Sequence, residues 1–172
     1  NNLSSIVISD SVTSIGSNAF EECDSLKSVM LSNSLLSISD YTFSGCDSLQ
    51  SVTLPKGLLS IGNYAFSYCT SLSSIIIPNS VTTIGDYAFD WCWLDEITLS
   101  DGLVTIGEGA FEGCSLTKVN IPKTVKKIGD NAFSGDFLSV VITQDNVEIG
   151  DDAFGSDTVV FCPSTTKINN QG

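Results

Sequence analysis

The chain has 172 residues, of which 42% are hydrophobic, so it is long and apolar enough to bury a sizeable core. Twenty acidic residues and seven basic ones give a net charge of −13. This charge argues against nucleic acid and anionic lipid as partners, because both need clustered positive charge. No apolar run approaches membrane-spanning length, so we expect no membrane insertion by this segment.

A phenylalanine recurs along the chain at intervals of 23, 23, 23, 22, 22 and 21 residues. Self-similarity at such a period is typical of a solenoid, in which each unit stacks on its neighbours. The recurring residues are Phe20, Phe43, Phe66, Phe89, Phe111, Phe133 and Phe154. We expect the first six to form one buried column. The pattern predicts a single domain over residues 1–172, with an irregular repeat from about residue 137. Because the chain begins inside a repeat, we expect it to be a fragment of a longer protein.

Each repeat opens with a short segment that alternates apolar and polar residues, and this alternation predicts a strand with one buried face. Leu72, Ile75 and Ile77 are the predicted inward-facing residues of one such segment, and Pro78 ends it. The equivalent segments are Leu3–Ile8, Leu26–Leu31, Leu49–Leu54, Leu94–Leu99 and Leu116–Ile121. In the last repeat the register is open: either Val140 and Ile142, or Val141, faces inward.

The second half of the repeat contains an apolar pair, a glycine and a polar residue before Ala-Phe. The pair, for example Val81 and Ile84, is too short to fix a period. The glycine indicates a positive φ or a close approach of backbones, and Ser39 replaces it once. The polar residue suits a helix N-cap, so we expect one helical turn from it to the cysteine position. The polar residues are Ser17, Asp40, Asn63, Asp86, Glu108, Asp130 and Asp151.

Taken together, the unit Leu-x-x-Val-x-Ile-Pro-x-Ser-Val-Thr-x-Ile-Gly-Asp-x-Ala-Phe-x-x-Cys resembles the BspA-type leucine-rich repeat. The stretch from Leu72 to Cys92 matches at nearly every defined position, and the likeness covers about Leu3 to Phe154. The resemblance implies an α/β solenoid: a curved, right-handed stack of about seven repeats, with a parallel sheet on the concave face and short helical turns opposite. It also implies an extracellular or cell-surface location and a role in adhesion.

Five cysteines, each three residues after a phenylalanine, form a second column: Cys23, Cys46, Cys69, Cys92 and Cys114. We expect buried thiols, because free cysteine is among the most buried residue types. Disulfides or a metal site are the alternative interpretation. Cys162, the sixth cysteine, does not belong to this column. Calcium on the acidic cap positions is a further alternative, although each repeat supplies few oxygen ligands.

Two surfaces are candidates for binding. The first is the outward side of the predicted sheet, with Met30, Thr53, Ile76 and Thr98 at its centre and Glu96 and Lys118 at its rim. The second is an aromatic edge, defined by Tyr68, Trp91 and Trp93, where rings suit sugars or protein anchors. These rings, and those of Tyr41, Tyr64 and Tyr87, can instead simply cover one another.

Catalysis has no support in the sequence, because the chain has no histidine and no phosphate-binding glycine loop. We expect no enzyme activity, no cofactor and no metal. The leading hypothesis is a surface-exposed module for protein binding or adhesion, with a host or microbial surface protein as ligand. The alternatives are a carbohydrate-binding module, for which a glycan is the partner, and a structural spacer in a larger cell-surface protein.

Overall fold

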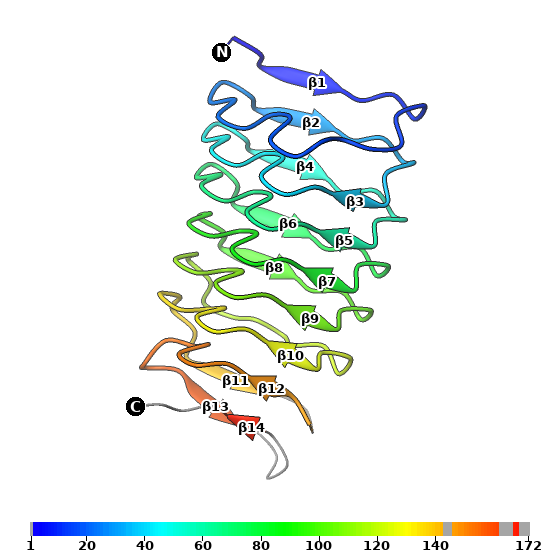
Figure 1. Ribbon diagram of the computed structural model, residues 1–172. Coiled ribbons are helices and arrows are strands. Elements are labelled where there is room, and N and C mark those ends of the chain that lie inside the picture. The colour runs from blue at the N-terminus through cyan, green and yellow to red at the C-terminus, as the bar shows by residue number, and fades with distance from the viewer. Residues whose placement is uncertain (1, 143–145, 162–166, 169–172) are drawn as a thin grey trace.

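The computed structural model describes residues 2–142, 146–161 and 167–168. The chain forms a β-solenoid, with its two ends at opposite ends of the stack (Figure 1). Most coils contribute a strand to each of two columns and a turn segment that contains the recurring phenylalanine. The described residues form no helix, so the α/β part of the predicted fold class is wrong.

The first strand column is the one that the sequence predicts. Its strands are β1 (Ser5–Val7), β2 (Ser28–Met30), β4 (Ser51–Thr53), β6 (Ser74–Ile76), β8 (Glu96–Thr98), β11 (Val140–Ile142) and β13 (Val159–Phe161). The pairings are parallel and join equivalent residues of successive repeats, so the alternation stays in phase along the stack. One predicted strand is missing: residues 119–121 form none, although Val119 and Ile121 are buried and Asn120 is exposed. In β11, Val140, Val141 and Ile142 pair with Val159, Val160 and Phe161. Which of the β11 side chains faces inward lies outside what the structure describes.

The second strand column is built from the apolar pairs whose period the sequence left undetermined. Its strands are β3 (Ser37–Ile38), β5 (Ser60–Ile61), β7 (Thr83–Ile84), β9 (Thr105–Ile106), β10 (Lys127–Ile128), β12 (Glu148–Ile149) and β14 (Lys167–Ile168). They form one continuous parallel sheet. Each strand has only two residues, which is too short for alternation to be recognised in a sequence.

The turn segment replaces the predicted helical turn. The residues two before and two after the phenylalanine adopt the left-handed conformation, for example Tyr64 with φ of 54° and Tyr68 with φ of 58°. Alternate N–H groups point to the next coil: those of Tyr64 and Phe66 donate to the carbonyls of Asp86 and Ala88 at 2.9 and 2.8 Å. A helix would use these groups internally, so the expected helical turns are wrong.

The polar cap position joins neighbouring coils and caps no helix. Asp40 Oδ1 accepts the backbone N–H of Asn63 at 2.7 Å, and Asn63 Oδ1 accepts that of Asp86 at 2.8 Å. The preceding glycine makes this approach possible: a Cβ on Gly85 would lie 2.7 Å from the backbone nitrogen of Asn63. Close approach, and not a positive φ, therefore explains the column from Gly62 to Gly150, whereas Gly16 in the first coil has open space around it. Ser39 also has no positive φ.

The core follows the two predicted columns of side chains. Phenylalanine rings stack from coil to coil at centroid distances of 5.2–5.5 Å, from Phe20 to Phe154. The five inner rings are fully buried, and Phe20, at the end of the stack, is half-buried. The five cysteines of the second column are buried as predicted, and Cys162 lies outside the described residues.

Candidate binding surfaces

The outward side of the first strand column carries the four predicted centre residues, and the structure adds Val7 on β1 to them. Val7, Met30 and Thr53 lie in register on three neighbouring strands, and Ile76 and Thr98 do so on the next two. We call these five residues the strand-face column. Val7 is 71% exposed, Met30 63% and Ile76 73%. Large apolar side chains this exposed on a sheet face stand out because the rest of the face is mostly serine and threonine.

The strand-face column follows a groove at one end, and charged residues lie beside it at the other. A groove of about 890 Å³ follows its first three strands, and Val7, Met30, Thr53 and Lys56 are among its lining residues. Glu96 lies on β8 beside the column, in register with Ser74, and Lys118 is exposed on the following repeat. The predicted centre and rim residues are therefore all on the surface, but only part of the centre lies in the groove.

The aromatic edge is also exposed, as the sequence predicts. Tyr68 is 52% exposed, Trp91 51% and Trp93 60%. Tyr68 and Trp91 occupy the same left-handed position in successive coils. The next coil has Gly113 at this position, where a Cβ would lie 3.2 Å from the Trp91 indole, so the glycine gives the ring room.

The tyrosines two residues before the phenylalanine cover one another. Tyr41 stacks on Tyr64 with centroids 4.8 Å apart, and Tyr64 stacks on Tyr87 at 5.0 Å. The Tyr87 hydroxyl donates to the Glu108 carboxylate at 2.5 Å, and this bond raises the pKa of Tyr87. These three rings therefore form a ladder along the stack, which leaves Tyr68, Trp91 and Trp93 as the more accessible aromatic group.

The cysteine column has a hydrogen-bonding role that the sequence interpretation missed. Cys92 Sγ donates to the carbonyl of Phe66 at 3.0 Å, and Cys114 Sγ donates to that of Phe89 at 3.2 Å. Burial raises the pKa of both thiols. Cysteine thus combines a small apolar volume with a weak donor, which explains why it recurs there.

Asp136 takes the cysteine position one repeat later, where its carboxyl group is largely buried. Its Oδ1 accepts the N–H of Leu116 at 3.1 Å, while Oδ2 is buried without a partner among the described residues. Burial raises the pKa of Asp136 to about 8. Burial likewise raises the pKa of Asp90 to about 6, and the nearby Glu112 adds to the shift. Both pKa shifts thus follow from packing in the turn column.

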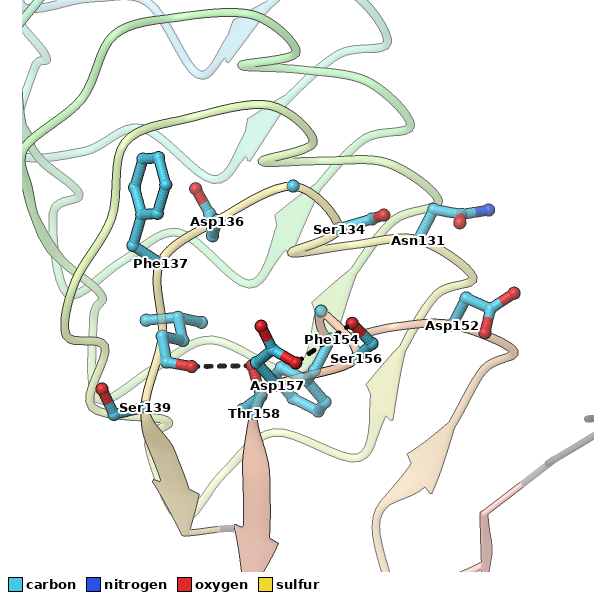
Figure 2. A pocket seen from close by; sticks show the side chains of 13 residues that line it. Asn131, Ser134, Asp136, Phe137, Ser139, Asp152, Phe154, Ser156, Asp157 and Thr158 are labelled. Carbon is cyan, nitrogen blue, oxygen red and sulfur yellow. Dashed lines mark hydrogen bonds between the residues drawn. The ribbon is translucent and has the colours of Figure 1, made fainter.

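A second hollow lies at the C-terminal end of the stack, between the last two turn segments (Figure 2). It has a volume of about 700 Å³, and Asp136, Asp152, Phe154 and Asp157 are among its lining residues. Thr158 closes one side, where its hydroxyl donates to the carbonyl of Leu138 at 2.8 Å. The sequence interpretation did not identify this region, because it falls in the least regular repeat.

Within the described ranges, no three histidine, cysteine, aspartate or glutamate side chains are grouped so that they could hold a metal ion. The cap carboxylates that the calcium alternative would use accept backbone N–H groups of the next coil in several repeats. A long apolar helix of the kind that crosses a membrane is likewise not found in the part of the chain that the structure describes.

Comparison with known proteins identifies the repeat. The chain matches the family of the BspA-type leucine-rich repeat region, with six copies of the repeat, over residues 1–92 and 60–171. A comparison with curated proteins found no match.

Three solved structures are similar to this solenoid. A leucine-rich repeat protein from Bacteroides ovatus is 31% identical with a TM-score of 0.74, over 97% of this chain and 51% of that one. A leucine-rich repeat protein from T. pallidum is 31% identical with a TM-score of 0.76, over 88% and 75%. A leucine-rich cell surface protein from Faecalibacterium prausnitzii is 26% identical with a TM-score of 0.64, over 95% and 62%.

The chain thus spans about half the length of the first of these relatives. The family comparison finds six copies of the repeat, whereas the phenylalanine spacing predicts about seven. With its parallel strand columns and its buried phenylalanine and cysteine columns, the protein belongs to the BspA-type leucine-rich repeat family and forms a β-solenoid of about six turns.

Proposed function

We propose that the protein is a non-enzymatic binding module of a cell-surface protein, and that it recognises a protein ligand through the strand-face column. The observation that carries the proposal is the exposure of Val7, Met30 and Ile76 on an otherwise hydroxyl-rich sheet. Binding sites are centred on clustered apolar or aromatic side chains surrounded by polar ones, and this arrangement fits that description. The cell-surface location rests on the family and on the printed description of the Faecalibacterium relative.

The geometry of the face favours an extended protein surface over a small molecule. The strands of the column are parallel and in register, so their outward side chains form a shallow row and no closed cavity. Its acidic and basic rim residues, Glu96 and Lys118, lie near one end and would set the orientation of a charged partner.

The decisive variant is Ile76→Asp, which places a charge at the centre of the column on a side chain that is already exposed. The probe is a panel of purified extracellular host proteins, with binding measured by surface plasmon resonance. Because Ile76 is 73% exposed, we expect the variant to keep its melting temperature and to lose binding. Leu59→Asp is the matched control, because Leu59 is also apolar and exposed, and it directly precedes β5 of the other strand column.

A carbohydrate-binding function is the second candidate, and the three exposed rings of the aromatic edge favour it. A glycan array tests it, with the double variant Trp91→Ala, Trp93→Ala as the negative control. If Ile76→Asp binds normally and the double variant does not, the aromatic edge is the binding site and the strand-face proposal is wrong. A structural spacer would bind nothing in either assay.

A further inference from the structure

The strand-face column contains one sulfur atom. Met30 is the only methionine of the chain, and its side chain is 63% exposed. It lies on β2, in register with Val7 on β1 and Thr53 on β4, and all three residues line the groove of about 890 Å³. Because β1 and β4 flank β2 within the sheet, the exposure of Met30 does not depend on either end of the stack.

The chemistry of Met30 differs from that of the residues around it. The other outward side chains of β1, β2 and β4 are hydroxyl-bearing, apart from Val7. A thioether is apolar and flexible, so it suits a surface that adapts to a ligand, and it is also a side chain that oxidants attack. Met30 therefore gives the groove both an apolar contact and a reactive atom.

The column cysteines, in contrast, are protected from oxidants in two ways. Their side chains are at most 6% exposed. A thiol reacts as its thiolate, and burial raises the pKa of Cys46 to about 12. The Sγ atoms of Cys46 and Cys69 also donate to the carbonyls of Phe20 and Phe43, both at 3.2 Å. Among the described residues, Met30 thus carries the accessible sulfur.

Oxidation of Met30 by a peroxide is a transfer of one oxygen atom. A sulfur lone pair attacks one peroxide oxygen, and the O–O bond breaks as the S–O bond forms. The proton on the transferred oxygen passes to the leaving hydroxide, which departs as water, so sulfur is oxidised by two electrons and the peroxide is reduced by two. The thioether has no proton to lose, so this reaction needs no ionisation of the protein.

We propose that Met30 is a site of reversible oxidation by peroxide, at which one added oxygen makes the middle of the groove polar and weakens its binding of apolar groups. An apolar side chain placed over the sulfoxide would remove water from a strong acceptor, and the neighbouring Val7 has no donor to replace it. Methionine sulfoxide reductases restore the thioether. The effect on a protein ligand rests on the proposed function of the strand-face column, whereas the oxidation itself does not.

The first experiment measures the oxidation in the full chain. The reagent is hydrogen peroxide, the readout is the mass of the proteolytic peptides, and the reference is N-acetyl-methionine amide in the same solution. We expect Met30 to be oxidised within about threefold of the reference rate, equally at about pH 6 and about pH 8, while the column cysteines stay unmodified. A rate about tenfold or more below the reference, or earlier oxidation of these cysteines, would overturn the proposal.

The second experiment measures the change in the groove, with the phenyl groups of a hydrophobic-interaction resin as the apolar probe. Peroxide should shorten the retention of the parent chain, and reductase treatment should restore it. Met30→Leu is compared with itself before and after peroxide, and its retention should not respond because leucine has no sulfur. An unchanged retention of the oxidised parent chain, or an equal response of Met30→Leu, would overturn the proposal.

The third experiment applies the same comparison to any protein of the surface plasmon resonance panel that the parent chain binds. Oxidation should weaken this binding about tenfold, as expected for a side chain at the centre of an interface, and should leave the affinity of Met30→Leu at its own starting value. If Ile76→Asp loses binding and oxidation has no effect, the proposal for Met30 is wrong and the proposed function stands. If no panel protein binds the parent chain, the proposed function fails, and the rate and retention measurements decide on Met30.

Discussion

Replacing Phe89 by alanine is the sharpest test of the stacked core. The Phe89 ring is fully buried and lies between two others, 5.3 Å from Phe66 and 5.3 Å from Phe111. Truncation of a buried phenylalanine costs about 3–5 kcal/mol through lost transfer energy and the cavity that remains. Each stacked pair adds about 0.5–1.5 kcal/mol, and two pairs are lost, so we expect a value near the top of that range.

Phe154→Ala provides the internal comparison for this prediction. Phe154 is half-buried and stacks on one ring, Phe133, so its truncation should cost about 2 kcal/mol less than that of Phe89. The assay is urea unfolding followed by circular dichroism and tryptophan fluorescence, which should give coincident transitions if unfolding is cooperative. A loss below about 1 kcal/mol for Phe89→Ala, or equal losses for both variants, would contradict the stacked column as a source of stability.

Three further predictions concern the turn column. Asp136 has a folded-state pKa of about 8, above its unfolded value of about 4, so the folded chain binds the extra proton and stability should fall as pH rises between these values. Asp136→Asn, which keeps an acceptor for Leu116, should flatten that part of the pH profile in denaturant titrations; an unchanged profile would exclude Asp136 as its cause. Gly85→Ala should lower the free energy of unfolding by about 1–3 kcal/mol, because the added Cβ would lie 2.7 Å from a backbone nitrogen. Gly57→Ala is the control, because the added methyl has open space around it, and equal melting temperatures of the two variants would refute the close-approach explanation. The buried cysteines should resist a thiol reagent in the folded chain and react with it in denaturant, and rapid labelling of the folded chain would contradict their burial. A chelator should leave the melting temperature unchanged, and a lower melting temperature with chelator would indicate a metal site.

The sequence predicts much of this fold because two columns of side chains repeat at a fixed spacing. Phe89 and Cys92 are recognisable by position alone, and the alternation around Ile75 is long enough to indicate a strand. The conformation of the turn is harder to predict, because an Asp or Asn before Ala-Phe suits a helix cap and an inter-coil acceptor equally well. The signal for a left-handed backbone was nevertheless present: asparagine and glycine alternate with tyrosine at these positions, as at Gly109 and Asn131.

The candidate surfaces, too, can be predicted from the sequence only in part. The exposure of Ile76 and Trp91 follows from their phase in the repeat, which a sequence records directly. The groove beside Met30 depends on how successive coils are offset, and that offset is a property of the stack. A single repeat contains no information on that offset.

The glycine column also bears on how such a protein can change its length. Each coil meets its neighbours through the same contacts, so the junction above a coil is chemically equivalent to the junction below it. A gene segment that encodes one period can therefore be duplicated or lost, at any starting point within the period, and the new junction still brings a glycine against a cap residue. Recombination can lengthen or shorten the strand columns in steps of one coil while the cross-section stays constant.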